Sequence, residues 1–308
     1  MQGHSLISGK QFPVIKLVGI GDAGLKTVDF LLDCKLASVN FVVIGTDKKM
    51  PLKSSTVKSN RISILLIEKN KNEIMDALSE SDLIFIVANI GDNADLETML
   101  EVARLARESD KLTIGVNIQQ CAQGDIHSLK DEEDKIMEIC KDMDAFAMMP
   151  TDKAIQSERC NVWTDKNIAK SNEFLLKFVS GIADAISSPD SDIIGLDFDI
   201  DVKYILGNAG MAFVGIGEAY GENAAVQAAR NAIENISHRE RIKDATRVLL
   251  SITGATDCLN QSQVSEAADA VAKEVHSDAE IIFISMDDDS LEGEVRVLLI
   301  ITGLAARE

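Results

Sequence analysis

Positive charge and aromatic side chains are both scarce in this 308-residue chain. Lys and Arg number 31 against 50 Asp and Glu, so the formal net charge is −19. Nucleic acids and anionic membrane surfaces are bound through clustered Lys and Arg, and this balance therefore argues against both as direct partners. Aromatic residues make up 4% of the chain, with Trp163 as the one tryptophan. The core must be built mainly from aliphatic side chains.

Cysteine and histidine are too scattered to form a disulfide framework or a metal site. The five cysteines include no Cys-x-x-Cys pair, and the four histidines do not fall at metal-ligand spacing from them. No apolar run reaches the length of a membrane span, and residues 1–12 lack the apolar core of a signal peptide. We therefore expect a cytoplasmic protein with reduced thiols. The residues concerned are Cys34, Cys121, Cys140, Cys160 and Cys258, with His4, His127, His238 and His276.

The first half of the chain alternates short apolar runs with amphipathic stretches. Most of these runs are continuously apolar, as strands covered on both faces are. The alternation predicts a doubly wound, Rossmann-like α/β domain over residues 13–166. The expected strands are Val14–Val18, Phe41–Ile44, Ile62–Ile67, Leu83–Ala88, Leu112–Val116 and Ala145–Met149, and the expected helices are Lys26–Cys34, Glu73–Leu78, Leu96–Glu108 and Glu132–Met143.

A long helix and a smaller domain are predicted for the second half. Apolar residues recur at helical spacing over residues 167–188, and Pro189 then ends the helix because proline cannot continue it. Residues 189–308 predict a smaller α+β domain. Its expected strands are Ala212–Ala219, Val248–Thr253, Glu280–Ser285 and Val295–Thr302, with helices near Ala224–Ile236 and Ser262–Val275.

A glycine motif follows the first expected strand and opens a helix. The run Gly19-Ile20-Gly21-Asp22-Ala23-Gly24 matches G-x-G-x-x-G, whose glycines let backbone approach a phosphate. Asp47, after the second strand, would be the acid that binds a ribose hydroxyl in an NAD-dependent oxidoreductase. Asp22 opposes this interpretation, because a carboxylate repels a phosphate. No catalytic His or Lys constellation follows in the second half.

An acidic loop precedes the strands of the second domain. Asp197, Asp199 and Asp201 lie close together ahead of a helix-like stretch, and a glycine-punctuated apolar strand and a new helix follow. This run resembles the acidic synergy loop and following strand of FtsZ, the bacterial and archaeal relative of tubulin. The resemblance covers about residues 13–304. It also includes the segments Gly207–Gly217, Gly221–Asn223, Asp244–Gly254, Glu294–Gly303, Gly45-Thr46-Asp47 and Pro150-Thr151-Asp152-Lys153, and Asn172.

The resemblance implies the tubulin/FtsZ fold and a cytoskeletal, cell-division role with GTP or GDP and Mg²⁺ as ligands. It also implies longitudinal contacts with a second copy or with an FtsZ-family protein, and an activation-type C-terminal domain. In the family, two loop carboxylates orient or polarise water at the GTP of the neighbouring subunit. Asp197 matches the first and Asp201 the second, but the segment between them is one residue longer, so Asp199 is an alternative. The alternative without chemistry is a solvated loop that caps the helix at Asp201–Leu206. The nucleotide-binding residues implied on this chain are Gly19, Gly21, Asp22, Gly24, Asp47, Gly91, Asp92 and Asn172.

Departures from the family cluster where the nucleotide is expected. Of the family's glycine-rich signature after the fourth strand only Gly91 survives, and acidic residues follow it at Asp92 and Asp95. A phosphate nest needs converging backbone N–H groups, and added carboxylates oppose an anion there. Asp92 and Asp95 would alternatively cap the helix Leu96–Glu108, or hold a phosphate through Mg²⁺. Further departures are Ala23 and Leu25 in the first loop, the short connection Glu68–Asn72, Thr151 in place of Asn, and Gln123 and His127 where the family has Glu and Arg.

Three functions remain open. We favour a pseudo-GTPase that associates with itself or with an FtsZ-family filament, since the second domain keeps the family pattern while the nucleotide loops do not. The alternatives are a divergent filament-forming GTPase and a scaffold or regulator unrelated to division filaments. The family's disordered C-terminal linker and adaptor-binding peptide are not in this sequence, so we do not expect membrane tethering through them.

Overall fold

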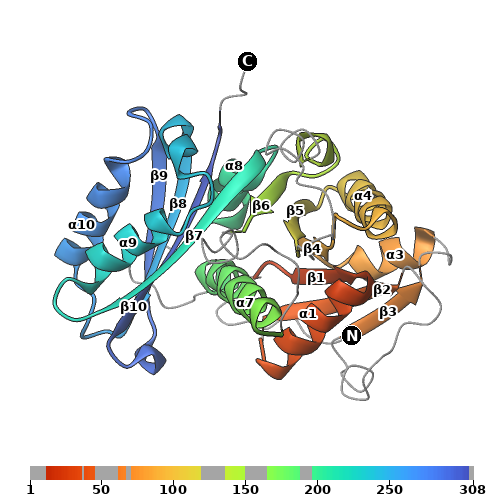
Figure 1. Cartoon of the computed structure of the whole chain (residues 1–308), viewed down its shortest axis with the longest axis horizontal. Helices are drawn as coiled ribbons and strands as arrows, with labels where there is room; N and C mark the ends of the chain where they lie inside the picture. The colour runs from red at the N-terminus through yellow and green to blue at the C-terminus, as the bar shows by residue number, and fades with distance from the viewer. Residues whose placement is uncertain are drawn as a thin grey trace. The chain divides into compact units, whose positions relative to one another are not determined.

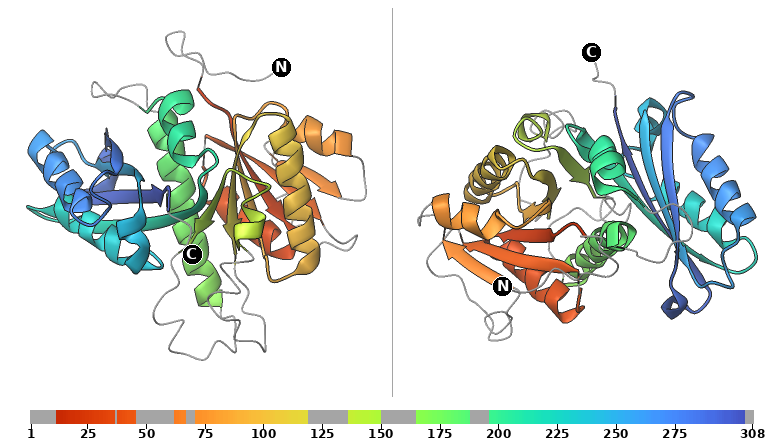
Figure 2. Two further views of the ribbon diagram at one scale, coloured as in Figure 1. Left: turned by 90° about the horizontal axis from the view of Figure 1, so that it is seen from above. Right: turned by 180° about the vertical axis from the view of Figure 1, so that it is seen from behind.

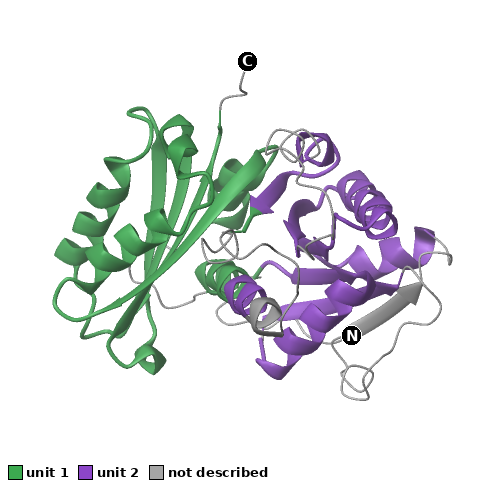
Figure 3. Cartoon of the chain, viewed as in Figure 1, with its two compact units in different colours: residues 1–12, 148–151, 177–308 green, residues 13–147, 152–176 purple. Residues whose placement is uncertain are grey.

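The computed structural model describes residues 12–36, 38–45, 62–66, 71–118, 136–149, 165–187 and 196–304. The chain forms two compact units, shown in Figure 3. Unit 1 comprises residues 1–12, 148–151 and 177–308, and unit 2 comprises residues 13–147 and 152–176. Helix α7 (Asp165–Ser187) is divided between them at residue 177.

Unit 2 contains the predicted doubly wound α/β arrangement. Its strands pair in parallel in the order β3-β2-β1-β4-β5-β6. The order reverses between β1 and β4, and the carboxyl ends of strands at such a switch point are where open α/β sheets bind ligands. The strands are β1 (Ile15–Ile20), β2 (Val39–Gly45), β3 (Ile62–Leu66), β4 (Leu83–Ala88), β5 (Leu112–Asn117) and β6 (Ala145–Met148).

Helices cover both faces of this sheet, with α1 and α4 on opposite sides of it (Figure 1). Helix α3 packs beside α4, where the Lys71 ammonium lies 2.7 Å from a Glu101 carboxylate oxygen. The helices are α1 (Gly21–Asp33), α3 (Lys71–Leu78) and α4 (Asn93–Glu108).

Two helix boundaries differ from the prediction. Helix α1 begins at Gly21 rather than Lys26, because Gly21 has a φ of +65° and turns the chain directly from β1 into the helix. The helix expected over Glu132–Met143 ends at Ile139, and its expected beginning lies outside the described residues. It ends early because tight backbone turns follow, with the Asp142 N–H donating to the Ile139 carbonyl over 3.1 Å.

Unit 1 is an α+β layer with strand order β7-β10-β8-β9. Strand β10 runs antiparallel to β7 and β8, and β9 runs parallel to β8. Helices α9 and α10 pack on one face of this sheet around an aliphatic, alanine-rich core, as Figure 2 shows from behind. The elements are η1 (Phe198–Val202), α8 (Lys203–Leu206), β7 (Gly210–Tyr220), α9 (Ala224–Glu234), η2 (Arg239–Asp244), β8 (Arg247–Gly254), α10 (Gln261–Ala272), β9 (Glu280–Asp287), η3 (Asp289–Leu291) and β10 (Glu294–Thr302).

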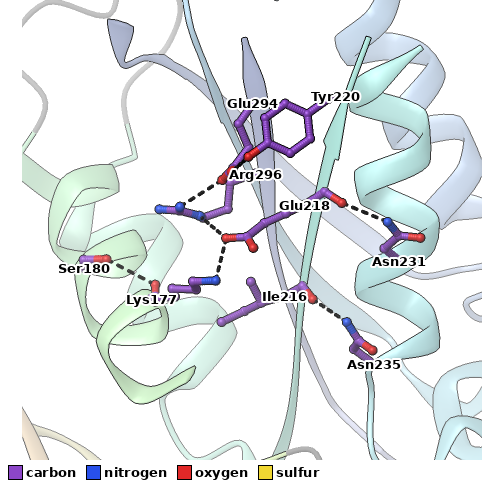
Figure 4. A network of polar contacts seen from close by, with 9 residues as sticks. All are labelled: Lys177, Ser180, Ile216, Glu218, Tyr220, Asn231, Asn235, Glu294 and Arg296. Carbon is purple, nitrogen blue, oxygen red and sulfur yellow. Dashed lines mark hydrogen bonds and ion pairs between the residues drawn. The ribbon is translucent and has the colours of Figure 1, made fainter. Parts of the chain in front are cut away.

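A charged cluster joins the second half of α7 to this sheet (Figure 4). A Glu218 carboxylate oxygen lies 2.7 Å from the Lys177 ammonium and 2.8 Å from Nε of Arg296. Arg296 also bonds Glu294 at 3.0 Å, and the Tyr220 hydroxyl donates to Glu294. Burial opposes ionisation of Glu218, but the hydrogen bonds from Lys177 and Arg296 outweigh it and lower its pKa.

Among the described residues, no helix is long and apolar enough to cross a membrane.

Candidate nucleotide edge and acidic loop

The glycines of the first loop are placed for close packing of α1 on its sheet. A Cβ added to Gly24 would lie 2.5 Å from the carbonyl carbon of Gly19 and 3.0 Å from the carbonyl oxygen of Val87 in β4. A Cβ added to Gly19 would lie 2.6 Å from the carbonyl oxygen of Gly24. The first and last glycines of the motif are therefore required by the contact of α1 with β1 and β4, whether or not a ligand binds.

Backbone N–H groups of the loop between β4 and α4 are hydrogen-bonded within the chain. The Ile90 N–H donates to the side-chain oxygen of Asn117 at 3.2 Å. The Gly91 N–H donates to the side-chain oxygen of Asn89 at 3.0 Å. The Asp92 N–H donates to the Asn89 carbonyl at 3.0 Å. Successive N–H groups that point outward would make an anion nest. Here each of these three has an internal acceptor.

Asp92 is the N-cap of helix α4. Its Oδ1 accepts from the backbone N–H of Ala94 at 2.9 Å and of Asp95 at 3.1 Å. These are donors that the first turn of a helix otherwise offers to solvent or to an anion. The Asp92 carboxylate accepts these hydrogen bonds in place of an external anion, as the capping interpretation of Asp92 predicts.

Asp95 is buried against Gly21. Its side chain is in the first turn of α4 and is 7% exposed. A Cβ on Gly21 would collide with both carboxylate oxygens of Asp95. Only glycine fits at position 21, because the position combines a φ of +65° with this carboxylate contact. The β1–α1 junction and the β4–α4 loop at the switch point are thus in contact through the buried Asp95 carboxylate.

Asn172, which the family resemblance places at the guanine base of the nucleotide, is a buried residue of α7. It is 4% exposed, and its Oδ1 accepts a hydrogen bond from the Thr27 hydroxyl of α1 at 3.0 Å. This bond ties α7 to α1 within unit 2. Asp22 is exposed in the first turn of α1. Asp47, Gln123 and His127, the residues expected around the ribose, lie outside the described residues, as does the segment from Pro150 to Lys153.

The acidic loop is held by reciprocal bonds between its two outer aspartates. Asp197 Oδ1 accepts from the N–H of Asp199 at 2.9 Å and of Ile200 at 3.0 Å, and Asp201 Oδ2 accepts from the Asp197 N–H at 2.8 Å. The loop winds in a wide π-type turn in which the Asp197 carbonyl accepts from the N–H of Asp201 at 2.8 Å and of Val202 at 3.2 Å. The turn keeps Asp197 and Asp201 together despite the longer segment.

The middle of this loop is exposed. The Asp199 side chain is 77% exposed and pairs with the Lys203 ammonium at 2.8 Å, four residues further on. Ile200 is 70% exposed. The loop therefore presents both an ion pair and an apolar tip.

Comparison with known proteins finds similarity to FtsZ. Residues 210–305 match the model of the FtsZ family C-terminal domain. The cell division protein FtsZ of Bartonella bacilliformis is 30% identical over 309 residues, which is 95% of this chain and 52% of that protein. FtsZ of Rickettsia conorii is 29% identical over 312 residues, 96% of this chain and 68% of that protein. This chain is similar to FtsZ over nearly its whole length, and its residues 210–305 match the FtsZ C-terminal domain.

Solved structures confirm the tubulin/FtsZ fold for this FtsZ-like chain. An empty FtsZ dimer from M. jannaschii matches with a TM-score of 0.72 at 23% identity, covering 94% of this chain and 88% of that one. The GTPgS-bound protofilament of CetZ2 from Haloferax volcanii matches with a TM-score of 0.69 at 18% identity, covering 96% and 94%. The chain spans about half the length of the Bartonella relative.

Sequence reasoning missed the asparagines that close the β4–α4 loop. Asn89 directly follows β4, and Asn117 is the last residue of β5. Polar side chains at the carboxyl ends of neighbouring parallel strands were the available signal. The described residues contain no group of three or more His, Cys, Asp or Glu side chains placed to hold a metal ion.

Proposed function

We propose that this FtsZ-like chain acts by association, with itself or with an FtsZ-family filament, and does not hydrolyse GTP efficiently. The observation that carries the proposal is the closed loop after β4. Five backbone N–H groups of this loop and the first turn of α4 already have acceptors within the chain: those of Ile90, Gly91, Asp92, Ala94 and Asp95.

The donor set at this edge does not fit a nucleotide phosphate. A phosphate is held by free N–H groups and positive side chains, whereas Asp92 and Asp95 bring carboxylates to the same place. Opening the loop for a phosphate would break the two capping bonds of Asp92 and leave its charge beside the ligand. Mg²⁺ could neutralise part of this repulsion, but in the described residues no preformed cluster of ligands holds one.

Association is supported by the second unit and its acidic loop. The match to the FtsZ C-terminal domain covers residues 210–305, so the unit that the family model describes is retained. Asp197 and Asp201 keep a defined conformation, and Ile200 is exposed between them. A loop whose backbone is fixed by its own hydrogen bonds can present Ile200 to a partner with little loss of conformational entropy.

The test is nucleotide binding and turnover by the purified protein, with and without Mg²⁺, beside an active FtsZ as reference. We expect no saturable GTP binding, and equal sedimentation of the protein, alone or with FtsZ filaments, with and without added GTP. Micromolar GTP affinity with steady phosphate release would refute the proposal.

A divergent filament-forming GTPase is the second candidate, and the acidic loop favours it. The π-type turn keeps both carboxylates that the family resemblance assigns to the neighbouring subunit's GTP. This candidate requires that Asp197→Asn and Asp201→Asn each abolish any measured turnover. Asn keeps a side-chain oxygen that can accept the hydrogen bonds that Asp197 and Asp201 accept, so both variants keep the fold.

A further inference from the structure

We infer that Asp95 is a built-in anion that stands where a ligand phosphate would lie at the first turn of α1. The inference rests on the proposed function in one respect. It takes the carboxyl ends of β1 and β4 as the place where a nucleotide would bind. In this inference, the Asp95 side chain of α4 excludes anions from the first turn of α1.

The contact itself is the first step. Asp95 is 7% exposed, although an acid in the first turn of a helix ordinarily faces solvent. Its carboxylate is seated on Gly21, closely enough that even a methyl group on Gly21 would overlap both oxygens. A buried carboxylate is expensive unless positive charge or donors compensate it.

The carboxylate lies beside the N-terminus of α1. Helix α1 is 13 residues long, and its N-cap is Ile20, which has no side-chain acceptor. The positive end of its dipole therefore receives no negative group from its own cap. Helix α4 differs, because its N-cap Asp92 accepts from two amides of its own first turn. Asp95 of α4 brings a carboxylate against Gly21, the first residue of α1, in addition to the exposed Asp22 of its first turn.

The consequence is specificity against anions. A phosphate bound at Gly21 would need the space that the Asp95 carboxylate fills, and would face its charge at contact distance. Like charges in direct contact cost several kcal/mol, so Asp95 excludes phosphate by both volume and charge. Asp92 belongs to the same helix, but its Oδ1 accepts from the Ala94 and Asp95 N–H groups of that helix, so it provides a matched control.

The experiment measures binding of inorganic phosphate and of GDP to the full chain by calorimetry and by thermal shift. The variants are Asp95→Gly, which removes charge and volume, and Asp95→Asn, which removes charge alone, with Asp92→Asn as the control. Circular dichroism establishes that each variant is folded. We expect at least about tenfold tighter phosphate binding in a folded Asp95 variant than in wild type, and no gain in the Asp92 variant.

The inference is overturned if neither folded Asp95 variant gains phosphate affinity, or if Asp92→Asn gains as much. This failure is separable from failure of the proposed function. Tight GTP binding with turnover in wild type would refute the pseudo-GTPase proposal, and a further gain on removing Asp95 would still support its role. Absence of phosphate and GDP binding in every folded variant would leave the proposed function standing and remove the role of Asp95.

Discussion

Replacing Gly21 by alanine tests the contact on which the buried acid depends. The new methyl group meets two separate obstacles. Position 21 has a φ of +65°, which costs an L-residue about 1–2 kcal/mol. The methyl group would also overlap the Asp95 carboxylate, and overpacking of this kind costs roughly 1–3 kcal/mol. We therefore expect Gly21→Ala to lower the free energy of unfolding by about 2–5 kcal/mol.

Gly210 offers a matched control on the same chain. Its φ is +68°, but a Cβ there would have no atom within 4 Å. Gly210→Ala should therefore show the backbone cost alone, about 1–2 kcal/mol. The difference between the two alanine variants then measures the overlap with Asp95.

Urea unfolding followed by circular dichroism measures both variants, and a double-mutant cycle isolates the contact. Combining Gly21→Ala with Asp95→Gly should recover the overlap term, so that the two changes couple by about 1–3 kcal/mol. Additivity within about 0.5 kcal/mol, or equal losses in Gly21→Ala and Gly210→Ala, would show that no such contact exists.

Three further outcomes follow from the same structure. Asp92→Ala should destabilise the protein by about 1 kcal/mol, and Asp92→Asn by much less, because Asn keeps the cap; thermal melts of the two variants compare them directly. Cys140, whose pKa is raised by burial to about 12, should resist alkylation in the native state at pH 8, where about one thiol in ten thousand is ionised; peptide mapping after native and denatured labelling checks this. Glu218→Gln should cost about 1 kcal/mol at neutral pH, since it weakens the bonds to Lys177 and Arg296. The pKa of Glu218 is lowered on folding, so its contribution is present above the ordinary carboxyl pKa and is lost as pH falls through the folded value. The gap between wild type and Glu218→Gln in urea unfolding should therefore close below about pH 4, and a gap that widens in acid would contradict the assignment.

The order of elements could be predicted because its signals are local. Continuous apolar runs marked β1, β4 and β5, and the apolar spacing over residues 167–188 predicted α7 to within two residues at either end. The start of α1 was misplaced for a local reason as well. A glycine with positive φ can join a strand to a helix with no loop, and glycine in a sequence does not state its φ.

The acidic loop shows an intermediate case. Its three aspartates were identifiable from sequence, and the inserted residue raised the question of geometry. The answer depends on the backbone winding, because a π-type turn accommodates one extra residue without separating Asp197 from Asp201. A capping role for the loop was foreseen, but its reciprocal form was not.

The sequence alone determined that this is a doubly wound α/β unit followed by an α+β unit, with an FtsZ-like acidic loop and carboxylates beside its glycine motifs. The tertiary structure decided what those carboxylates do. Asp95 reaches Gly21, and Asn117 reaches Ile90, because β1 and β5 both flank β4 in the sheet. Hydrophobic periodicity records which residues face a core, but strand order decides which loops become neighbours, and only that adjacency brings the Asp95 carboxylate against Gly21.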